Sequence, residues 1–285
     1  MLQKNFYFLA RRFVAGETID AAIEAVRTLN AAGMSATLDF LGEDVLERDA
    51  ALRVRDVYFE MLAAIGASGV DSNVSVKLTA MGLLVDEEFA LENLLAVMEK
   101  AGGNADPFVR VDMEGSAVLA ATLRTVWRAY SISKNVGPVL QAYLKRTPDD
   151  IAAAIERGAR VRLCKGAYNE PDEIAYKKMP AIRAQYLELA KRLLSAGNYP
   201  GIATHDRRLI AAVKTFAAQR GIRSDGFEFQ MLFGCRPQVQ RDIVAQGYRL
   251  RIYVPFGTHW AGYFYRRVLE RRENALFALS SIFSR

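Results

Sequence analysis

The chain has 285 residues, of which 51% are hydrophobic and 25% are charged. This composition, together with the lack of any run of about 18 uninterrupted apolar residues, excludes a disordered chain, a collagen-like repeat and a bilayer-spanning protein. Lys and Arg outnumber Asp and Glu by 38 to 32, and the two signs are interspersed without a polybasic tail, which favours anionic small molecules or membrane surfaces over nucleic acid as partners.

Short β-branched or apolar runs alternate along the chain with longer segments of helical periodicity. Thr18 and Asp86 are each expected to cap a helix, and Thr147 a third helix whose first position is Pro148. In chain order, the sequence predicts a helix over 18–29, strands over 35–40 and 74–78, a helix from 86 that ends before 102, strands over 108–112 and 137–142, a helix from 147 that ends before 158, strands over 160–164 and 202–204, a helix over 207–220, a strand over 227–231, a helix over 237–246 and a strand over 250–254.

Strand and helix alternate eight times without a linker, which predicts one α/β domain with a (βα)8 TIM-like barrel. We expect the barrel to occupy residues 17–285, after a short N-terminal arm over residues 1–16. A doubly wound open sheet is the alternative, but it more often carries a glycine-rich phosphate turn after its first strand, and none follows Phe40 here. Two cysteines and an N-terminus without the features of a secretory signal favour the cytoplasm.

Polar side chains stand at the carboxyl ends of the predicted strands, where the active site of such a barrel is built. A structural ion pair or a solvated strand end explains any one of them, but chance explains so many strand ends poorly. The set comprises Glu43, Lys77, Asp112, Glu114, Gln141, Arg162, Lys165, His205, Asp206 and Gln230.

Lys77 lies in an apolar strand, and its ammonium would need a partner such as Asp112 on the next strand. The pair could be structural, the lysine could hold an anionic substrate, or it could form a Schiff base. The two histidines, His205 and His259, lie outside any metal-motif spacing, so no metal site is predicted. Cys164 is interpreted as a small core residue rather than as an activated thiol.

A predicted helix near the C-terminus places Tyr263, Arg266, Arg267 and Glu270 on one face. Two adjacent guanidiniums repel each other, and the arrangement becomes favourable when a planar carboxylate accepts hydrogen bonds from both. The sequence therefore favours a carboxylate clamp here. A solvated basic helix end is the alternative, because two more arginines follow directly.

Eight motifs taken together resemble, in order, the strand-end motifs of FAD-dependent proline dehydrogenase. The similarity is to the monofunctional bacterial enzymes and to the corresponding domain of bifunctional proline utilization A, and it covers nearly the whole chain. Each motif alone is weak, but eight in the right order are specific. They are SVKLT at 75–79, RVDME at 110–114, LQAY at 140–143, RLCKGAY at 162–168, ATHD at 203–206, FEFQML at 227–232, YVPFG at 253–257 and YFYRR at 263–267.

The resemblance implies a distorted (βα)8 barrel that holds FAD noncovalently at the carboxyl ends of the strands, with the last helix lying over them. It implies that Arg162 lies near the flavin N5 and that Gln141 contacts the pyrimidine edge. The other residues that it assigns to the cofactor are Cys164, Lys165, Gly166, Ala167, Thr204, His205, Asp206, Gln230 and Glu270.

The resemblance also implies roles toward the substrate, proline. Asp112 would orient Lys77 and Tyr253, and together with Arg162 these residues would form the catalytic group. Glu43 would pair with Arg266 and close the site. The residues that it assigns to the substrate carboxylate are Lys77, Arg266 and Arg267, and those that it assigns to the pyrrolidine ring are Tyr253, Tyr263, Ala167 and Leu232.

The implied reaction is the oxidation of L-proline to Δ1-pyrroline-5-carboxylate, the first step of proline catabolism to glutamate, with electrons passing through FAD to a quinone. The net charge of +6 is compatible with a peripheral contact with an anionic membrane surface. The alternatives are a flavoenzyme for a related cyclic or N-alkyl amino acid, a Schiff-base aldolase that uses Lys77 or Lys165, and a noncatalytic barrel.

Overall fold

Eight parallel strands close into a barrel in the computed structural model, which describes residues 12–261. The strands follow one another around the barrel in chain order, and the last pairs with the first. Each overlaps a strand predicted from the sequence, so the predicted barrel is confirmed. Their bounds are β1 Ser35–Phe40, β2 Ser72–Val76, β3 Val109–Val111, β4 Val136–Gln141, β5 Arg162–Cys164, β6 Gly201–Ala203, β7 Glu228–Leu232 and β8 Arg249–Phe256.

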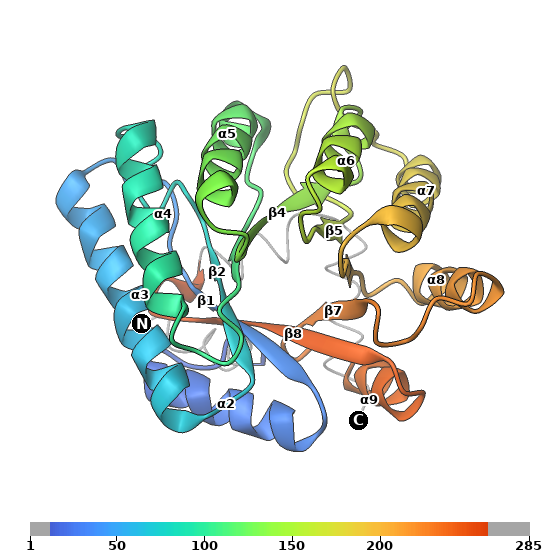
Figure 1. Cartoon of the computed structure of the whole chain (residues 1–285), viewed down its shortest axis with the longest axis horizontal. Helices are drawn as coiled ribbons and strands as arrows, with labels where there is room; N and C mark the ends of the chain where they lie inside the picture. Colours follow the sequence, from blue (N-terminus) through green and yellow to red (C-terminus); the bar gives the residue numbers. More distant parts are fainter. Residues whose placement is uncertain (1–11, 262–285) are drawn as a thin grey trace.

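A ring of helices surrounds the strands (Figure 1). Helices α3 to α9 each follow a strand, whereas α2 precedes β1 and packs against β1, β8 and α3. Helix α2 therefore covers the outside of the barrel where the last strand meets the first. The helices of the described part are α2 Ile19–Ala31, α3 Arg48–Ser68, α4 Glu87–Ala101, α5 Ser116–Ile132, α6 Thr147–Glu156, α7 Met179–Ala196, α8 Arg207–Gln219 and α9 Pro237–Ala245.

The helix starts follow local hydrogen-bonding chemistry. Thr18 accepts a hydrogen bond from the backbone N–H of Ala21 at 3.3 Å, and Asp86 caps α4 by accepting from the N–H of Phe89 at 2.8 Å, as predicted. The prediction that Thr147 caps α6 is wrong. Its hydroxyl instead donates to the carbonyl oxygen of Gln141 at 2.6 Å, so Thr147 is the first helical residue and joins α6 to the end of β4.

The interior of the barrel is polar, although closed eight-stranded barrels are usually filled by branched apolar side chains. Outward-facing residues such as Leu38, Val74 and Ile252 are fully buried beneath the helices. The alternate positions of the same strands carry charged and amide side chains that are also buried. These are Thr37, Asp39, Asn73, Ser75, Arg110, Arg162, Glu228, Gln230 and Arg251.

Hydrogen bonds link the polar interior residues across neighbouring strands. At the amino end of the barrel, Arg251 pairs with Asp106 at 3.1 Å and, through Nε, with Glu228 at 2.9 Å. Glu228 accepts from the amide nitrogen of Gln230 at 2.5 Å, and Gln230 in turn accepts from Arg162. A buried column of polar side chains therefore runs through the barrel to its carboxyl end.

The described part of the predicted N-terminal arm is attached to the barrel. The N–H of Ala15 donates to the carbonyl oxygen of Pro255 at 2.9 Å, and the N–H of Gly257 donates to that of Gly16 at 3.0 Å. Val14 is buried against Leu41 and Trp260. Residues 14–16 are thus anchored beside the carboxyl end of β8.

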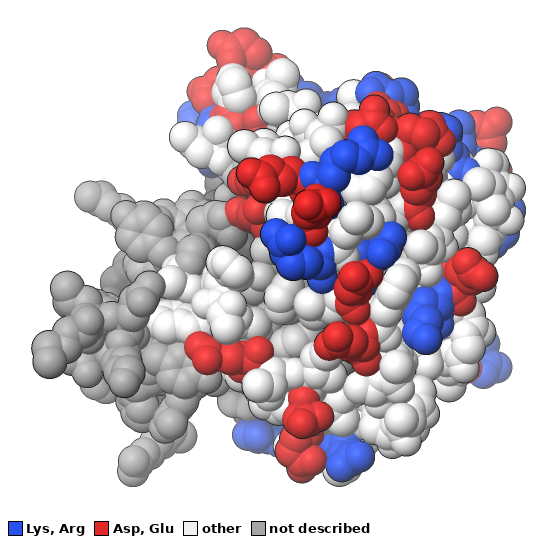
Figure 2. All heavy atoms as spheres, turned by 90° about the vertical axis from the view of Figure 1, so that its left-hand side faces the viewer, with Lys and Arg blue, Asp and Glu red and all other residues white. Residues whose placement is uncertain are grey.

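The outer surface carries charges of both signs. Figure 2 shows the face on the side of α3 and α4, where basic and acidic side chains alternate. Arg124 and Arg128 of α5, for example, pair with Glu87 and Glu88 of α4, each at 2.7 Å. Within residues 12–261, no helix is both long and apolar enough to cross a bilayer.

Candidate active site

A cavity of about 540 Å³ opens at the carboxyl ends of the strands. Of the predicted site residues in the described part of the chain, all but Glu114 line this cavity, whereas Tyr263, Arg266, Arg267 and Glu270 lie outside that part. The predicted residues that line the cavity are Glu43, Lys77, Asp112, Gln141, Arg162, Cys164, Lys165, Gly166, Ala167, Thr204, His205, Asp206, Gln230, Leu232 and Tyr253.

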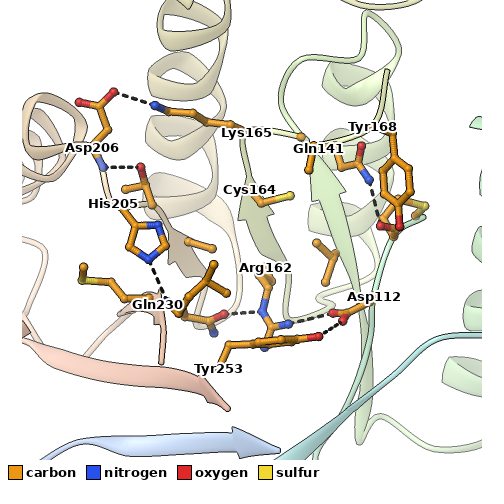
Figure 3. Close-up of a pocket in the computed structure, with 18 of the residues that line it drawn as sticks. Asp112, Gln141, Arg162, Cys164, Lys165, Tyr168, His205, Asp206, Gln230 and Tyr253 are labelled. Carbon is orange, nitrogen blue, oxygen red and sulfur yellow. Dashed lines mark hydrogen bonds and ion pairs between the residues drawn. The ribbon is translucent and has the colours of Figure 1, made fainter. Parts of the chain in front are cut away.

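The guanidinium of Arg162 lies at the base of this cavity, between Gln230 and Asp112 (Figure 3). Its Nε donates to Gln230 Oε1, and its Nη1 donates to Asp112 Oδ1 at 2.9 Å and to Ser75 Oγ at 3.2 Å. The ring of Tyr253 lies against it, with its centroid 5.4 Å from Cζ. Arg162 is therefore a buried cation whose orientation is fixed from several sides.

Asp112 connects Arg162 to Tyr253. Its Oδ2 accepts from the hydroxyl of Tyr253 at 2.9 Å, and its Oδ1 accepts from Ser75 Oγ at 2.7 Å. Burial alone would raise the pKa of Asp112, but the charges of Lys77 and Arg162 outweigh burial, so the pKa lies below its ordinary value. Asp112 is thus ionised at neutral pH and holds the other groups in place.

The nearest partner of Lys77 is Asp39, which the sequence analysis did not identify. Lys77 Nζ lies 2.8 Å and 2.9 Å from the two carboxylate oxygens of Asp39, but 3.7 Å from Asp112 Oδ2. It also donates to the hydroxyl of Tyr253 at 3.3 Å. The signal for Asp39 was present in the sequence, because an aspartate inside an apolar barrel strand requires a nearby cation.

This pairing determines what Lys77 can do chemically. Burial alone would lower its pKa, but Asp39 and Asp112 raise the pKa above the ordinary value of a lysine. Schiff-base formation needs a neutral amine. Lys77 is held protonated, and Lys165 is paired with Asp206 at 2.7 Å, so neither lysine is suited to the aldolase chemistry considered as an alternative.

The other half of the cavity, after β5 to β7, is rich in cations. Asp206 caps the start of α8 and accepts from Lys165 Nζ and Arg183 Nε, each at 2.7 Å. Burial alone would raise the pKa of Asp206, but these bonds hold it below its ordinary value. The further cationic side chains that line this half are Arg207, Arg208 and Arg236. Sequence reasoning missed these three arginines and Arg183, because all four lie in helices and connections rather than at strand ends.

Hydrogen bonds fix the orientation of two side chains that line the cavity, Gln141 and His205. The amide nitrogen of Gln141 donates to the carbonyl oxygens of Met113 at 3.0 Å and Glu114 at 3.2 Å. Its Oε1 is buried and has no hydrogen-bond donor among residues 12–261. His205 Nε2 accepts from the N–H of Leu232 at 2.9 Å, so that nitrogen carries no proton. A buried amide oxygen without a donor is costly, and a ligand N–H would satisfy it.

Gly166 is required at its position by both backbone and packing. Its φ is +109°, and a Cβ there would lie 2.1 Å from the ring of Tyr143. We expect Gly166→Ala to lower the free energy of unfolding by about 2–4 kcal/mol, because it combines backbone strain with an overlap in the core. Urea denaturation measures this loss. Gly103→Ala, where a Cβ meets no atom within 4 Å, is the matched control, and equal losses in the two variants would contradict the assignment.

Glu114 is a buried carboxyl group with a pH-dependent contribution to stability. It accepts from the hydroxyl of Thr79 at 2.5 Å, and burial raises its pKa from 4.5 to about 7. The native state therefore keeps a proton that the unfolded chain has already released, so the stability from this group is lost as pH rises from 4.5 to about 7.

We expect Glu114→Gln to remove about 3 kcal/mol of this pH dependence. Denaturant midpoints measured at pH 5 and pH 8 test the expectation. Glu92→Gln, a substitution of an exposed glutamate, should leave the pH profile of the wild type unchanged. A Glu114→Gln profile that parallels the wild type would show that Glu114 does not titrate in this range.

The comparisons with known proteins agree on one family. A sequence model described as proline dehydrogenase matches residues 22–279. Proline dehydrogenase 1 of Bacillus subtilis is 40% identical over 96% of this chain and 90% of its own length. Proline dehydrogenase of Deinococcus radiodurans is 38% identical over 99% of this chain and 92% of its own length.

A solved structure extends this similarity to the fold. The crystal structure of proline utilization A from Bdellovibrio bacteriovorus, inactivated by N-propargylglycine, matches this chain with a TM-score of 0.89 at 26% identity. The match covers 100% of this chain but only 35% of that longer protein. The similarity therefore concerns one part of the larger enzyme.

Proposed function

The chain belongs to the proline dehydrogenase family and is an oxidoreductase of proline, and we propose that it uses FAD bound in the candidate active site and passes the electrons to a quinone. The observation that carries the proposal is the fixed guanidinium of Arg162, which shares one cavity with the buried oxygen of Gln141, to which no residue from 12 to 261 donates a hydrogen bond. The product of the reaction is Δ1-pyrroline-5-carboxylate.

The residues of the cavity fit FAD in two respects. Gln141 Oε1, which accepts no hydrogen bond within the described part of the chain, suits the N–H of the flavin pyrimidine ring, and the cationic half around Lys165 and Arg183 suits a diphosphate. A flavin can be held in this way without a glycine-rich helix terminus. The residues that would hold it are Gln141, Arg162, Cys164, Lys165, Gly166, Ala167, Thr204, His205, Asp206 and Gln230, together with Glu270.

When bound, FAD supplies the acceptor for the hydride removed from the proline ring. Arg162 places a buried positive charge that Asp112 and Gln230 hold in position, and such a charge stabilises electron density that develops beside it. Because Arg162 is only 6% exposed, little solvent screens its charge.

The described residues also form much of a binding site for the substrate carboxylate. Lys77 is held protonated at the cavity wall and binds the carboxylate together with Arg266 and Arg267. The ring of Tyr253, held through its hydroxyl by Asp112, forms one wall for the pyrrolidine ring. The residues proposed to complete this pocket are Ala167, Leu232 and Tyr263, with Glu43 paired with Arg266.

One titration tests the proposed function. The purified protein, saturated with FAD, should be yellow, and anaerobic addition of proline should bleach the flavin absorbance. Parallel titrations with hydroxyproline and an N-alkyl amino acid distinguish a related substrate from proline. We expect hydroxyproline to be a poor substrate because Tyr253 crowds the hydroxyl-bearing ring position. A protein that cannot be loaded with FAD would contradict the proposal.

The proposed quinone acceptor lies in a membrane, so the protein would meet it by peripheral contact from the cytoplasm. Co-sedimentation with anionic vesicles, with neutral vesicles as the control, tests this contact. Binding that is equal for both vesicle types would argue against recognition of a charged surface.

The clamp residues of the C-terminal segment can be tested by kinetics. We expect Arg266→Met and Arg267→Met each to raise the KM for proline at least about tenfold, because each removes half of a charge-assisted contact with the carboxylate. Steady-state kinetics with proline measure the change, and Arg271→Met is the control. An unchanged KM in both clamp variants would contradict the assignment.

A further inference from the structure

A second cavity, of about 570 Å³, lies at the opposite end of the barrel from the candidate active site. Each lining residue lies at most three positions from the first residue of a strand, so the set surrounds the amino ends of β1, β2, β3, β5, β6 and β8. They are Ser35, Asp71, Asp106, Arg160, Asn198, Tyr199, Arg249 and Arg251. None of the roles assigned above uses this cavity.

The charges that line the second cavity are unequal, with three arginines against two aspartates. Asp106 is already engaged, because it accepts from Asn73 at 2.9 Å and pairs with Arg251 at 3.1 Å. Asp71 accepts from the hydroxyl of Ser35 at 2.6 Å. Neither Arg160 nor Arg249 forms a salt bridge with a carboxylate of the described residues, and Asp225 and Glu228 act on Arg249 only as neighbouring charges.

Arg160 is the cation with fewest partners in this cavity. Its side chain makes no hydrogen bond or ion pair with any residue from 12 to 261, and its Nε is buried. It is held only by aromatic rings, with Cζ 4.2 Å from the ring centroid of Phe108 and 4.9 Å from that of Tyr199. A buried guanidinium N–H without an acceptor is costly, so an anion at this position would stabilise it.

Arg249 approaches the same aromatic ring. Its Cζ lies 5.5 Å from the ring centroid of Tyr199, and its Nη1 donates to the hydroxyl of Tyr199 at 3.2 Å. Tyr199 has a φ of +41°, in the left-handed region that a bulky residue rarely adopts. Its hydroxyl also donates to Glu228 at 3.2 Å. A strained tyrosine thus brings two guanidiniums to one ring.

More cations lie behind this pair. Burial, together with the neighbouring charges of Arg162, Arg160 and Arg251, lowers the pKa of Arg110 well below its ordinary value. Among the described residues, Arg110 donates to backbone acceptors alone, the carbonyl oxygens of Arg160 at 2.7 Å and Pro138 at 3.2 Å. The amino end of the barrel interior therefore has an excess of guanidiniums over carboxylates.

We propose that this cavity binds a small oxyanion, a carboxylate or a phosphate, between Arg160 and Arg249. A guanidinium presents a planar fork of N–H donors that matches the oxygens of both groups. The site lies at the far end of the barrel from the proposed flavin, so its existence does not depend on the proposed function.

Thermal unfolding and calorimetric titration of the FAD-saturated protein test the site, with sodium phosphate in one arm and sodium acetate in the other, each against sodium chloride at equal ionic strength. We expect at least one oxyanion to raise the melting temperature saturably beyond chloride. Arg160→Gln and Arg249→Gln should each weaken the affinity at least tenfold.

Arg128→Gln is the matched control, because Arg128 is 48% exposed and paired with Glu88 on the outer surface, outside the cavity. It should bind like the wild type. If Arg160→Gln does not fold, Arg249→Gln still tests the site, because Arg249 is exposed and its substitution should leave the fold intact. Stabilisation equal to that by chloride, or affinity unchanged in Arg249→Gln, would overturn the proposal. If Arg160→Gln and Arg249→Gln bind the oxyanion more weakly but bind FAD normally, the oxyanion is assigned to this cavity and not to the active site.

Discussion

Lys77→Met is expected to lower the free energy of unfolding by about 3–5 kcal/mol at pH 8, because it leaves the buried carboxylate of Asp39 and the partly buried carboxylate of Asp112 without their shared cation. Asp39 is completely buried, and both of its oxygens lie within 2.9 Å of Lys77 Nζ. Asp112 keeps Arg162 as a partner, so the larger part of the cost falls on Asp39.

The loss in Lys77→Met should depend on pH. Burial raises the pKa of Asp39 to about 6, although Lys77 counteracts the effect, and removal of the lysine raises the pKa further. A folded-state pKa above that of the unfolded chain gives stability at low pH that is lost as pH rises through the folded pKa. The variant should therefore differ less from the wild type at pH 5 than at pH 8.

A second substitution identifies the cause. Asp39→Asn removes the carboxylate charge that Lys77→Met leaves unpaired, so the double variant Lys77→Met/Asp39→Asn should recover much of the stability at pH 8. Its KM for proline should still exceed that of the wild type, because the lysine proposed to bind the substrate carboxylate is absent. Urea denaturation at both pH values measures the cycle. If Lys77→Met is as stable as the wild type, or if the double variant is no more stable than Lys77→Met, the pairing of Lys77 with Asp39 is contradicted.

Glu228→Gln is expected to reduce kcat/KM for proline about 100-fold, although Glu228 lies below the active site. The carboxylate of Glu228 accepts from Arg251, Tyr199 and the amide nitrogen of Gln230. The bond to Gln230 fixes that amide with its oxygen toward Arg162. An amide in place of the carboxylate frees Gln230 to turn, so Arg162 loses one of its acceptors.

The loss in Glu228→Gln should fall mainly on kcat, because the proposed carboxylate clamp does not include Arg162. The reduction potential and absorbance spectrum of bound FAD provide a second measurement that a loss of stability alone would not change. Glu188→Gln, which breaks an exposed pair with Arg192, is the control. A Glu228→Gln enzyme with an unchanged flavin spectrum and a changed KM only would refute the positioning role.

The sequence predicted the barrel because its signal is repeated, so an error in one strand boundary did not alter the fold. The strand-end residues, such as Lys77 and Arg162, were found because parallel strands bring their carboxyl ends to one place. Asp39 and Glu228 were missed because they lie within strands, where an apolar interior is the usual expectation. Arg183 was missed because its contact with Asp206 depends on how α7 packs against α8.

The Thr147 cap failed for a related reason. Sequence rules for helix caps consider only the neighbouring backbone, but the hydroxyl of Thr147 finds a carbonyl six residues earlier, at the end of a strand. Local rules held at Thr18 and Asp86. Thr147 therefore does not cap α6 because its hydroxyl bonds to a buried carbonyl oxygen elsewhere.

The position of helix α2 has a consequence for synthesis. This helix precedes β1, yet it packs against β8, which begins about 220 residues later and emerges from the ribosome roughly 10–45 s afterwards. Until then α2, whose buried residues include Ile23 and Val26, lacks one of its native partners. The barrel therefore cannot close until β8 has been synthesised. The contacts of β8 with β1 and α2 join residues far apart in the sequence, and a nascent chain can form them only near the end of translation.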